Sequence, residues 1–454
     1  MKRKSLAWTA SLCMVTALLA GCGHPGRPSP KDPVTLTMWH NYGGDMQKTM
    51  DALIDEFNST VGKEAGIIIN VINVTAISSS AELNESLDMI AAGDPGAPAM
   101  PDICTAYPKV AIQFQQTGRL ANLDSYFSQE ELSGYVPAFI EEGRLADGGL
   151  YVFPLAKSTE ILYLNQTLFD RFAAETGAKQ EQLATFEGIA ALSKMYYDWT
   201  DAKTPDIPGD GKMFFTADSW FNVAQAGMKQ LGSSLIEGET LNLSGETYAH
   251  IFATTYVPAV EGGIAIYDGY SSDLSKTGDL VCSTGSSAGI LFYGDTITYP
   301  DNTVEQVAYS ILPYPVFEGG TKTAIQRGGG LMVASNEEKK EYAAAVFIKW
   351  LTASEQNMRF ISSTGYLPVT RQAFETDMDA HIASVEDARI KKMLVAVTSM
   401  YREYRFFTPP NFAAFDDIGK EYEKRFKTLL ASRREAYLDG GDTGTETALA
   451  EIRK

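Results

Sequence analysis

The chain alternates strand-like segments with helix-like segments, and this alternation limits its fold most strongly. Residues 34–39 (VTLTMW) are β-branched and alternating, and apolar residues then recur at helical spacing over 46–57. Residues 67–74 form a second β-branched run, which is followed by an apolar helical face over 83–90. Strands separated by helices favour parallel sheets with crossover connections, so we expect an α/β fold.

The rest of the chain continues the pattern. We expect strands at 161–164, 263–267, 307–312 and 330–334, and the clearest later helix at 341–351. No internal repeat of 20 to 50 residues is present, which excludes solenoids and propellers.

The charge balance excludes one large class of partner. Asp and Glu total 57 against 38 Lys and Arg, a formal net charge of -19. A protein that reads nucleic acid needs a clustered basic face, so no nucleic-acid partner is expected. The 454 residues suggest two large domains or about three smaller ones, and 44% apolar residues suffice for their cores.

The N-terminus has the layout of a secretory signal peptide. A basic segment (2–4) precedes an uncharged apolar stretch (6–20) that is too short for a membrane span. The LAGC of residues 19–22 resembles the bacterial lipobox, which predicts a lipoprotein signal peptide over 1–21 and lipidation of Cys22. Residues 22–33 read as a flexible linker rich in Pro and Gly. The alternative is an ordinary signal peptide in which the Cys is a coincidence.

The remaining cysteines are Cys104 and Cys282. Neither has a second Cys or a His at metal-ligand spacing, so no metal site is expected, and whether the two pair stays open. No motif for a bound cofactor occurs either.

One short motif suggests an enzyme. Residues 285–289 (GSSAG) fit the G-x-S-x-G pattern, which would make Ser287 a nucleophile in a secreted serine hydrolase. The only histidine downstream is His381, which lies in a polar segment, and the glycine run at 327–330 follows the motif and lacks the usual His. A tight strand-to-helix turn is the favoured interpretation, and no catalysis is expected.

Aromatic and polar residues cluster after predicted strands, where ligands bind in open α/β sheets. Each one alone is more commonly a core or rim residue, but the set indicates a small-molecule site. Its members here are His40, Asn41, Tyr107, Ser158, Thr159, Trp220, Tyr293 and Tyr366.

Several segments occur together in an informative order. They are 34–40, 101–103, 118–124, 147–169, 185–187, 312–313, 329–330, 345–351 and 364–368. In this order the chain resembles the extracellular solute-binding proteins of bacterial ABC importers, in the group that takes up sugars and glycerol 3-phosphate. The resemblance runs from Val34 to the C-terminus. It departs at 288–290 (AGI), where the family often has an Ala-Met pair before a ligand-facing aromatic.

The resemblance implies a type II-like periplasmic-binding-protein fold, with two α/β lobes and one ligand in the cleft between them. The first lobe is expected over 34–154 plus 330–395, and the second over 155–329 plus 396–454. The chain is expected to cross between lobes near 151–157, 325–330 and 391–400.

The implied function is a lipid-anchored, extracytoplasmic, non-enzymatic monomer that delivers a carbohydrate to the permease subunits of an ABC importer by closing around it. To the residues above the resemblance adds Gly329 and Gly330 as cleft candidates. A neutral sugar is the expected ligand. The alternative, glycerol 3-phosphate or a glycerophosphodiester, would use Lys157, Arg402 or Arg405 as its cation. A binding protein that feeds a signalling receptor is a further alternative.

Overall fold

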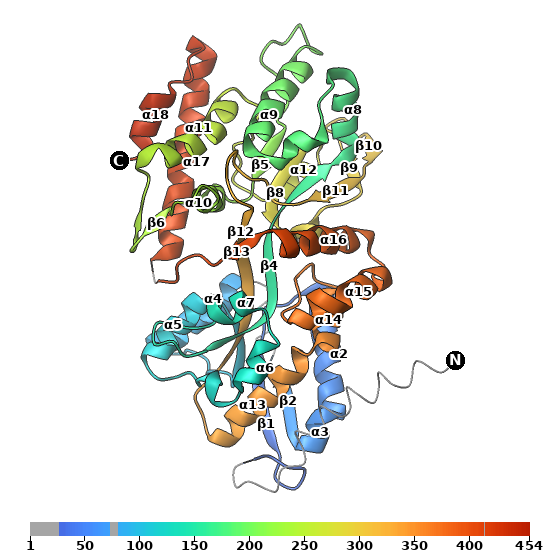
Figure 1. The fold of residues 1–454 in the computed structure, drawn as a ribbon, viewed down its shortest axis with the longest axis vertical. Coiled ribbons are helices and arrows are strands. Elements are labelled where there is room, and N and C mark those ends of the chain that lie inside the picture. The colour runs from blue at the N-terminus through green and yellow to red at the C-terminus, as the bar shows by residue number, and fades with distance from the viewer. Residues whose placement is uncertain (1–26, 73–79, 413) are drawn as a thin grey trace, which may run out of the picture. The chain divides into compact units, whose positions relative to one another are not determined.

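A computed structural model describes residues 27–72, 80–412 and 414–454. The chain divides into two compact α/β units, which confirms the expected fold class (Figure 1). Unit 1 comprises Met1–Leu155 and Gly329–Phe360, and unit 2 comprises Ala156–Gly328 and Ile361–Lys454. The predicted signal peptide, Cys22 and the linker up to residue 26 lie outside the described residues.

Unit 1 is built on a sheet with the strand order β2-β1-β3-β12. β1 runs parallel to both β2 and β3, as the crossover pattern predicted, whereas β12 runs antiparallel to β3. The strands are β1 (Val34–Trp39), β2 (Ile67–Val71), β3 (Ile103–Ala106) and the end of β12 (Thr323–Val333). The helices are α2 (Gly44–Ser59), α3 (Val61–Ala65), α4 (Ser80–Ala92), α5 (Pro108–Gln116), η1 (Leu123–Ser125), α6 (Gln129–Ser133), α7 (Pro137–Glu142), α13 (Glu338–Leu351) and α14 (Ser354–Ile361).

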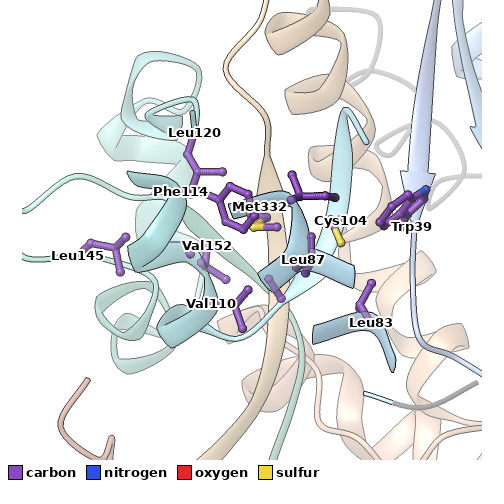
Figure 2. Packing of buried hydrophobic residues seen from close by; sticks show 13 residues of the cluster. Trp39, Leu83, Leu87, Cys104, Val110, Phe114, Leu120, Leu145, Val152 and Met332 are labelled. Atoms are coloured by element: carbon purple, nitrogen blue, oxygen red, sulfur yellow. The ribbon is translucent and has the colours of Figure 1, made fainter. Parts of the chain in front are cut away.

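Figure 2 shows how α4 and α5 cover this sheet. Leu87 of α4 and Phe114 of α5 pack with Trp39 of β1, Cys104 of β3 and Met332 of β12, all of them buried. Burying such side chains contributes roughly 1.5–3 kcal/mol each, so this cluster stabilises the packing of α4 and α5 on the sheet.

Unit 2 is built on a second group of strands. β8 pairs with β4 antiparallel and with β5 parallel, and β11 pairs with β4. The strands are β4 (Val152–Asn165), β5 (Phe215–Ala217), β6 (Ile236–Glu237), β7 (Thr240–Leu241), β8 (Cys282–Ser286), β9 (Thr296–Thr298), β10 (Val304–Gln306), β11 (Tyr309–Leu312), the start of β12, and β13 (Arg405–Phe407).

Helices flank these strands along the sequence. They are α8 (Gln166–Thr176), η2 (Gln180–Ala184), α9 (Phe186–Asp201), α10 (Trp220–Gln230), α11 (Gly245–Val260), α12 (Ser271–Ser275), η3 (Ser287–Phe292), η4 (Ala373–Asp377), α15 (Met378–Ser384), α16 (Ala388–Glu403), α17 (Phe415–Gly440) and α18 (Thr445–Ile452).

The chain passes between units at 155/156, 328/329 and 360/361. The first two positions lie inside the expected segments. The third does not, because residues 361–395 belong to unit 2 rather than to the first lobe. The cause is packing on unit 2, where Arg389 of α16 donates to the Leu291 and Tyr293 carbonyls and Lys392 donates to the Tyr309 carbonyl.

One predicted strand is absent as such. Residues 263–267 form a loop in which Ile264 makes a single bridge to Phe215. The backbone N–H groups of Gly263 and Ile264 donate to the carbonyl of Pro258, at the end of α11, so this segment has no full ladder partner.

Candidate functional site

Three strands of unit 2 bring polar residues to one edge. β5 and β8 are parallel, so their carboxyl ends meet, and Asp218 and Ser286 lie at those ends. β4 runs antiparallel to β8 with Glu160 opposite Ser286. Backbone pairing alone therefore gathers Glu160, Asp218 and Ser286, at the sheet edge where ligands bind in α/β proteins.

Glu160 is a carboxylate on a fully buried strand, and two donors hold it. Its Oε1 accepts from Arg327 Nη1 at 2.8 Å and from Asn222 Nδ2 at 3.0 Å. Its side chain is 3% exposed, whereas that of Arg327 is 43% exposed. Burial raises the pKa of Glu160 and Asp218 raises it further, while Arg327 and Asn222 hold it down.

Asp218 lies beside this pair. Its Oδ1 accepts from the backbone N–H of Ser271 at 2.8 Å. A Cβ on Gly285 would be 2.4 Å from Asp218 Oδ2, so the glycine leaves room for the carboxylate. Burial raises the pKa of Asp218, and the Ser271 N–H and the Arg327 guanidinium oppose that rise. We name Glu160, Asp218, Asn222 and Arg327 the polar cluster.

Exposed aromatic rings lie next to the polar cluster in the sequence. Tyr270 is 74% exposed and directly precedes Ser271, whose N–H binds Asp218. Tyr267 is partly exposed in the same loop, and its ring lies against Gly269. We did not select these tyrosines from the sequence. The Tyr-Asp-Gly-Tyr of 267–270 was a usable signal, because turn residues between two tyrosines favour exposed rings.

Tyr293, a predicted ligand residue, contacts the polar cluster through Ser271, whose N–H binds Asp218. It is buried, its ring stacks on Tyr163 at 4.0 Å, and its hydroxyl bonds Ser271 and Ser283 at 2.8 Å each. Its polar and aromatic groups are thus used within unit 2, which argues against a stacking role with ligand.

Trp220 is also a core residue rather than an exposed stacking platform. Its ring is 2% exposed and packs on Phe215 and Phe426. It begins α10, whose N-terminus binds Glu423: Oε1 of Glu423 accepts from Ser219 Oγ and from the Phe221 N–H, both at 2.8 Å. This contact fixes the helix that carries Asn222.

The other predicted ligand residues of unit 2 are Ser158, Thr159 and Tyr366. Thr159 is buried, and its hydroxyl donates to the Ile325 carbonyl at 2.9 Å, so it has a structural partner. Ser158 is buried and Tyr366 half-buried, and the bridge between Lys157 and Leu367 places them near each other.

The candidate cations lie apart from the polar cluster in different ways. Arg405 is exposed and pairs with Thr323, four residues before Arg327 on β12, or about 13 Å along the strand. Arg402 is exposed on α16. Lys157 is buried, and its Nζ donates to the Gly328 carbonyl at 3.1 Å. Arg327 is the cation of the polar cluster.

Unit 1 gathers a second predicted group. His40 and Asn41 follow β1 and Tyr107 follows β3, so the parallel pairing of these strands brings them to one edge. Asn41 Oδ1 accepts from Thr105 Oγ1 at 3.1 Å, and Tyr107 is partly exposed at the start of α5. His40 is buried, which lowers its pKa against the opposing effect of Asp51.

The two predicted glycines have a structural explanation. A Cβ on Gly330 would be 2.2 Å from the Phe153 carbonyl oxygen, and one on Gly329 would be 3.3 Å from that of Ala106. Gly330 also pairs with Ala106 in the sheet. Close packing of β12 on its neighbours, rather than access to ligand oxygens, therefore requires glycine at 330.

The serine hydrolase geometry is not formed. Ser287 is buried, and its Oγ accepts from the Thr159 N–H at 3.4 Å. The ring of His381 bonds Ser362 at 2.8 Å instead. A nucleophile must be exposed and paired with its base, and Ser287 is neither.

The residues that the structure describes bear on other classes of site. Cys104 and Cys282 are unpaired and buried, one in each unit, and burial raises the pKa of both thiols. Over the same residues, no group of three or more His, Cys, Asp and Glu is placed to hold a metal ion. No helix among them is long and apolar enough to cross a membrane.

Two α/β units, each with polar and aromatic side chains at the carboxyl ends of its strands, define a binding protein for small molecules. Residues 52–385 match the bacterial extracellular solute-binding proteins, and the chain belongs to that family. It is an extracytoplasmic solute-binding protein of an ABC importer.

Comparisons with individual proteins agree. The chain is 24% identical to the sn-glycerol-3-phosphate-binding periplasmic protein UgpB of Agrobacterium fabrum over 426 residues, 88% of each protein. The cyclic alpha-maltosyl-1,6-maltose binding protein of Arthrobacter globiformis has a similar fold, with a TM-score of 0.70 at 18% identity over 93% of this chain and 99% of that one. UgpB of Mycobacterium tuberculosis, in complex with glycerophosphocholine, gives 0.65 at 17% identity, over 95% and 97%.

Proposed function

We propose that this chain is a non-enzymatic, monomeric carbohydrate-binding subunit, anchored through a lipid on Cys22, and that a neutral sugar binds at the polar cluster. One observation carries the choice of ligand: the single arginine of the cluster stands among two carboxylates, Glu160 and Asp218. Carboxylate and amide oxygens accept bonds from sugar hydroxyls, and no positive charge remains uncompensated to attract an anion.

The neighbouring tyrosines suit the same ligand. The C–H faces of a sugar pack on aromatic rings, and Tyr270 presents its ring to solvent. The maltose-derived ligand named for the Arthrobacter globiformis protein belongs to this class of molecule.

Glycerol 3-phosphate is a second candidate. The Agrobacterium fabrum relative is named for it, and the Arg327 side chain is 43% exposed. A bound phosphate ester would need Arg327 to bind it despite Glu160, and its affinity would fall with rising salt.

Mass spectrometry of the solute released by denaturing purified protein tests the ligand class, followed by calorimetric titration at two salt concentrations. A neutral sugar should bind with an affinity that barely changes with salt. Tyr270→Ala should weaken that binding about tenfold or more, whereas Tyr437→Ala on α17 should leave it unchanged. Release of a phosphate ester, with salt-sensitive binding, would establish the second candidate instead.

A further inference from the structure

The charges of the polar cluster do not balance. Arg327 Nη1 is 2.8 Å from Glu160 Oε1, and Asp218 interacts electrostatically with both residues. Two carboxylates thus face one guanidinium. Phosphate recognition usually needs the opposite excess, with a guanidinium that can offer two N–H groups to the ligand.

Glu160 is held in place by its strand and by a second donor. It lies in the middle of β4, a strand whose 14 residues are all buried, and Asn222 holds the same oxygen from α10. Because β4 pairs with β8 at this position, the Glu160 backbone is fixed on a rigid element. Strand pairing and the Asn222 donor thus both hold the Glu160 carboxylate beside Arg327.

We propose that Glu160 sets the charge specificity of this site: it occupies Arg327 and, together with Asp218, repels phosphate esters that the same site would otherwise accept. The inference rests on the proposed function, since it explains how a neutral sugar is chosen by a protein related to glycerol-3-phosphate binders. Like charges repel more strongly in a partly buried site than in water, and this repulsion distinguishes an anionic ligand from a neutral one.

Glu160→Gln is the main test. Gln keeps the shape and the acceptor oxygen for Arg327 and Asn222 but removes one negative charge. Affinity for glycerol 3-phosphate should rise about tenfold to a hundredfold and become salt-sensitive, while affinity for the neutral sugar changes only a few-fold. Asp218→Asn should produce a smaller rise in the same direction, and it serves as the test if Glu160→Gln does not fold. Adding Arg327→Gln to Glu160→Gln should abolish the gain.

The matched control is Glu305→Gln, which removes the carboxylate from an Arg171–Glu305 pair elsewhere in unit 2. An equal gain in phosphate-ester affinity in this control would show an effect of overall charge and overturn the proposal. Folded Glu160→Gln and Asp218→Asn proteins that gain no affinity would also overturn it, but sugar binding by the wild type would leave the proposed function intact. Tight glycerol 3-phosphate binding by the wild type would overturn both.

Discussion

Gly328 of β12 packs closely against the backbone of β4. The loss of unfolding free energy in Gly328→Ala measures how strongly this packing requires glycine. Its φ is +99°, and an added Cβ would lie 2.3 Å from the Ala156 carbonyl oxygen and 2.7 Å from Lys157 Cα. These are backbone atoms of β4, so they cannot rotate away. β4 and β12 would have to separate by about 1 Å at the point where Lys157 donates to the Gly328 carbonyl.

We expect Gly328→Ala to cost about 1–2 kcal/mol for the left-handed backbone and about 1–3 kcal/mol more for overpacking. Gly209→Ala is the control: its φ is +89°, and its nearest neighbour, the Tyr197 hydroxyl, is 4.0 Å from the added Cβ. It should lose only the backbone contribution. Urea unfolding with both variants measures the difference. Equal losses of unfolding free energy in the two variants would refute the packing explanation for Gly328.

The remaining predictions concern Glu423, Ser287 and Cys22. Burial raises the pKa of the Glu423 carboxyl above its ordinary 4.5, so the folded state binds the carboxyl proton more tightly than the unfolded state does. The resulting stabilisation is full below pH 4.5 and is lost as the pH rises through the folded-state pKa. Glu423→Gln should flatten this loss in urea midpoints measured from acidic to neutral pH, and an unchanged slope would contradict it. Ser287→Ala should cost about 1 kcal/mol or less and leave sugar binding intact, whereas labelling of Ser287 by a serine-reactive probe would reinstate the hydrolase. Cys22→Ala should move the mature protein from the detergent phase to the aqueous phase, and wild-type protein already in the aqueous phase would exclude the anchor.

The spacing of apolar residues predicted most of the helices and strands, because it shows which face of each element is buried. The alternation of 34–39 and the helical spacing of 46–57 reappear as β1 and α2, where apolar side chains are buried on one face. The strand predicted at 263–267 is wrong because Ile264 and Ala265 are buried beside α11 and β5 with only a single bridge to β5, and the sequence does not show how far strand pairing extends. The third passage between the units lies at 360/361 and not at 391–400, because its position depends on which unit α15 and α16 pack against.

The strand-end rule predicts which edge of a sheet carries polar residues, but it does not predict which side chains there are exposed. In unit 1, His40 and Asn41 follow β1 and Tyr107 follows β3, at the same edge of the sheet. In unit 2 the rule selected Trp220 and Tyr293, whose rings are buried against other aromatics. Large aromatic residues are common in cores, so residue type alone cannot separate a ring that packs inside from one that meets a ligand.

Glu160 was missed because its environment is non-local. In the sequence it stands between Thr159 and Ile161, directly before the strand expected at 161–164. The structure places it inside β4, whose residues are all buried, where a carboxylate is costly. Its presence there required a partner, and Arg327 is 167 residues away along the chain. A charged residue inside an otherwise buried strand is therefore a signal in its own right: it predicts a distant partner of opposite charge, and here that partner belongs to the polar cluster.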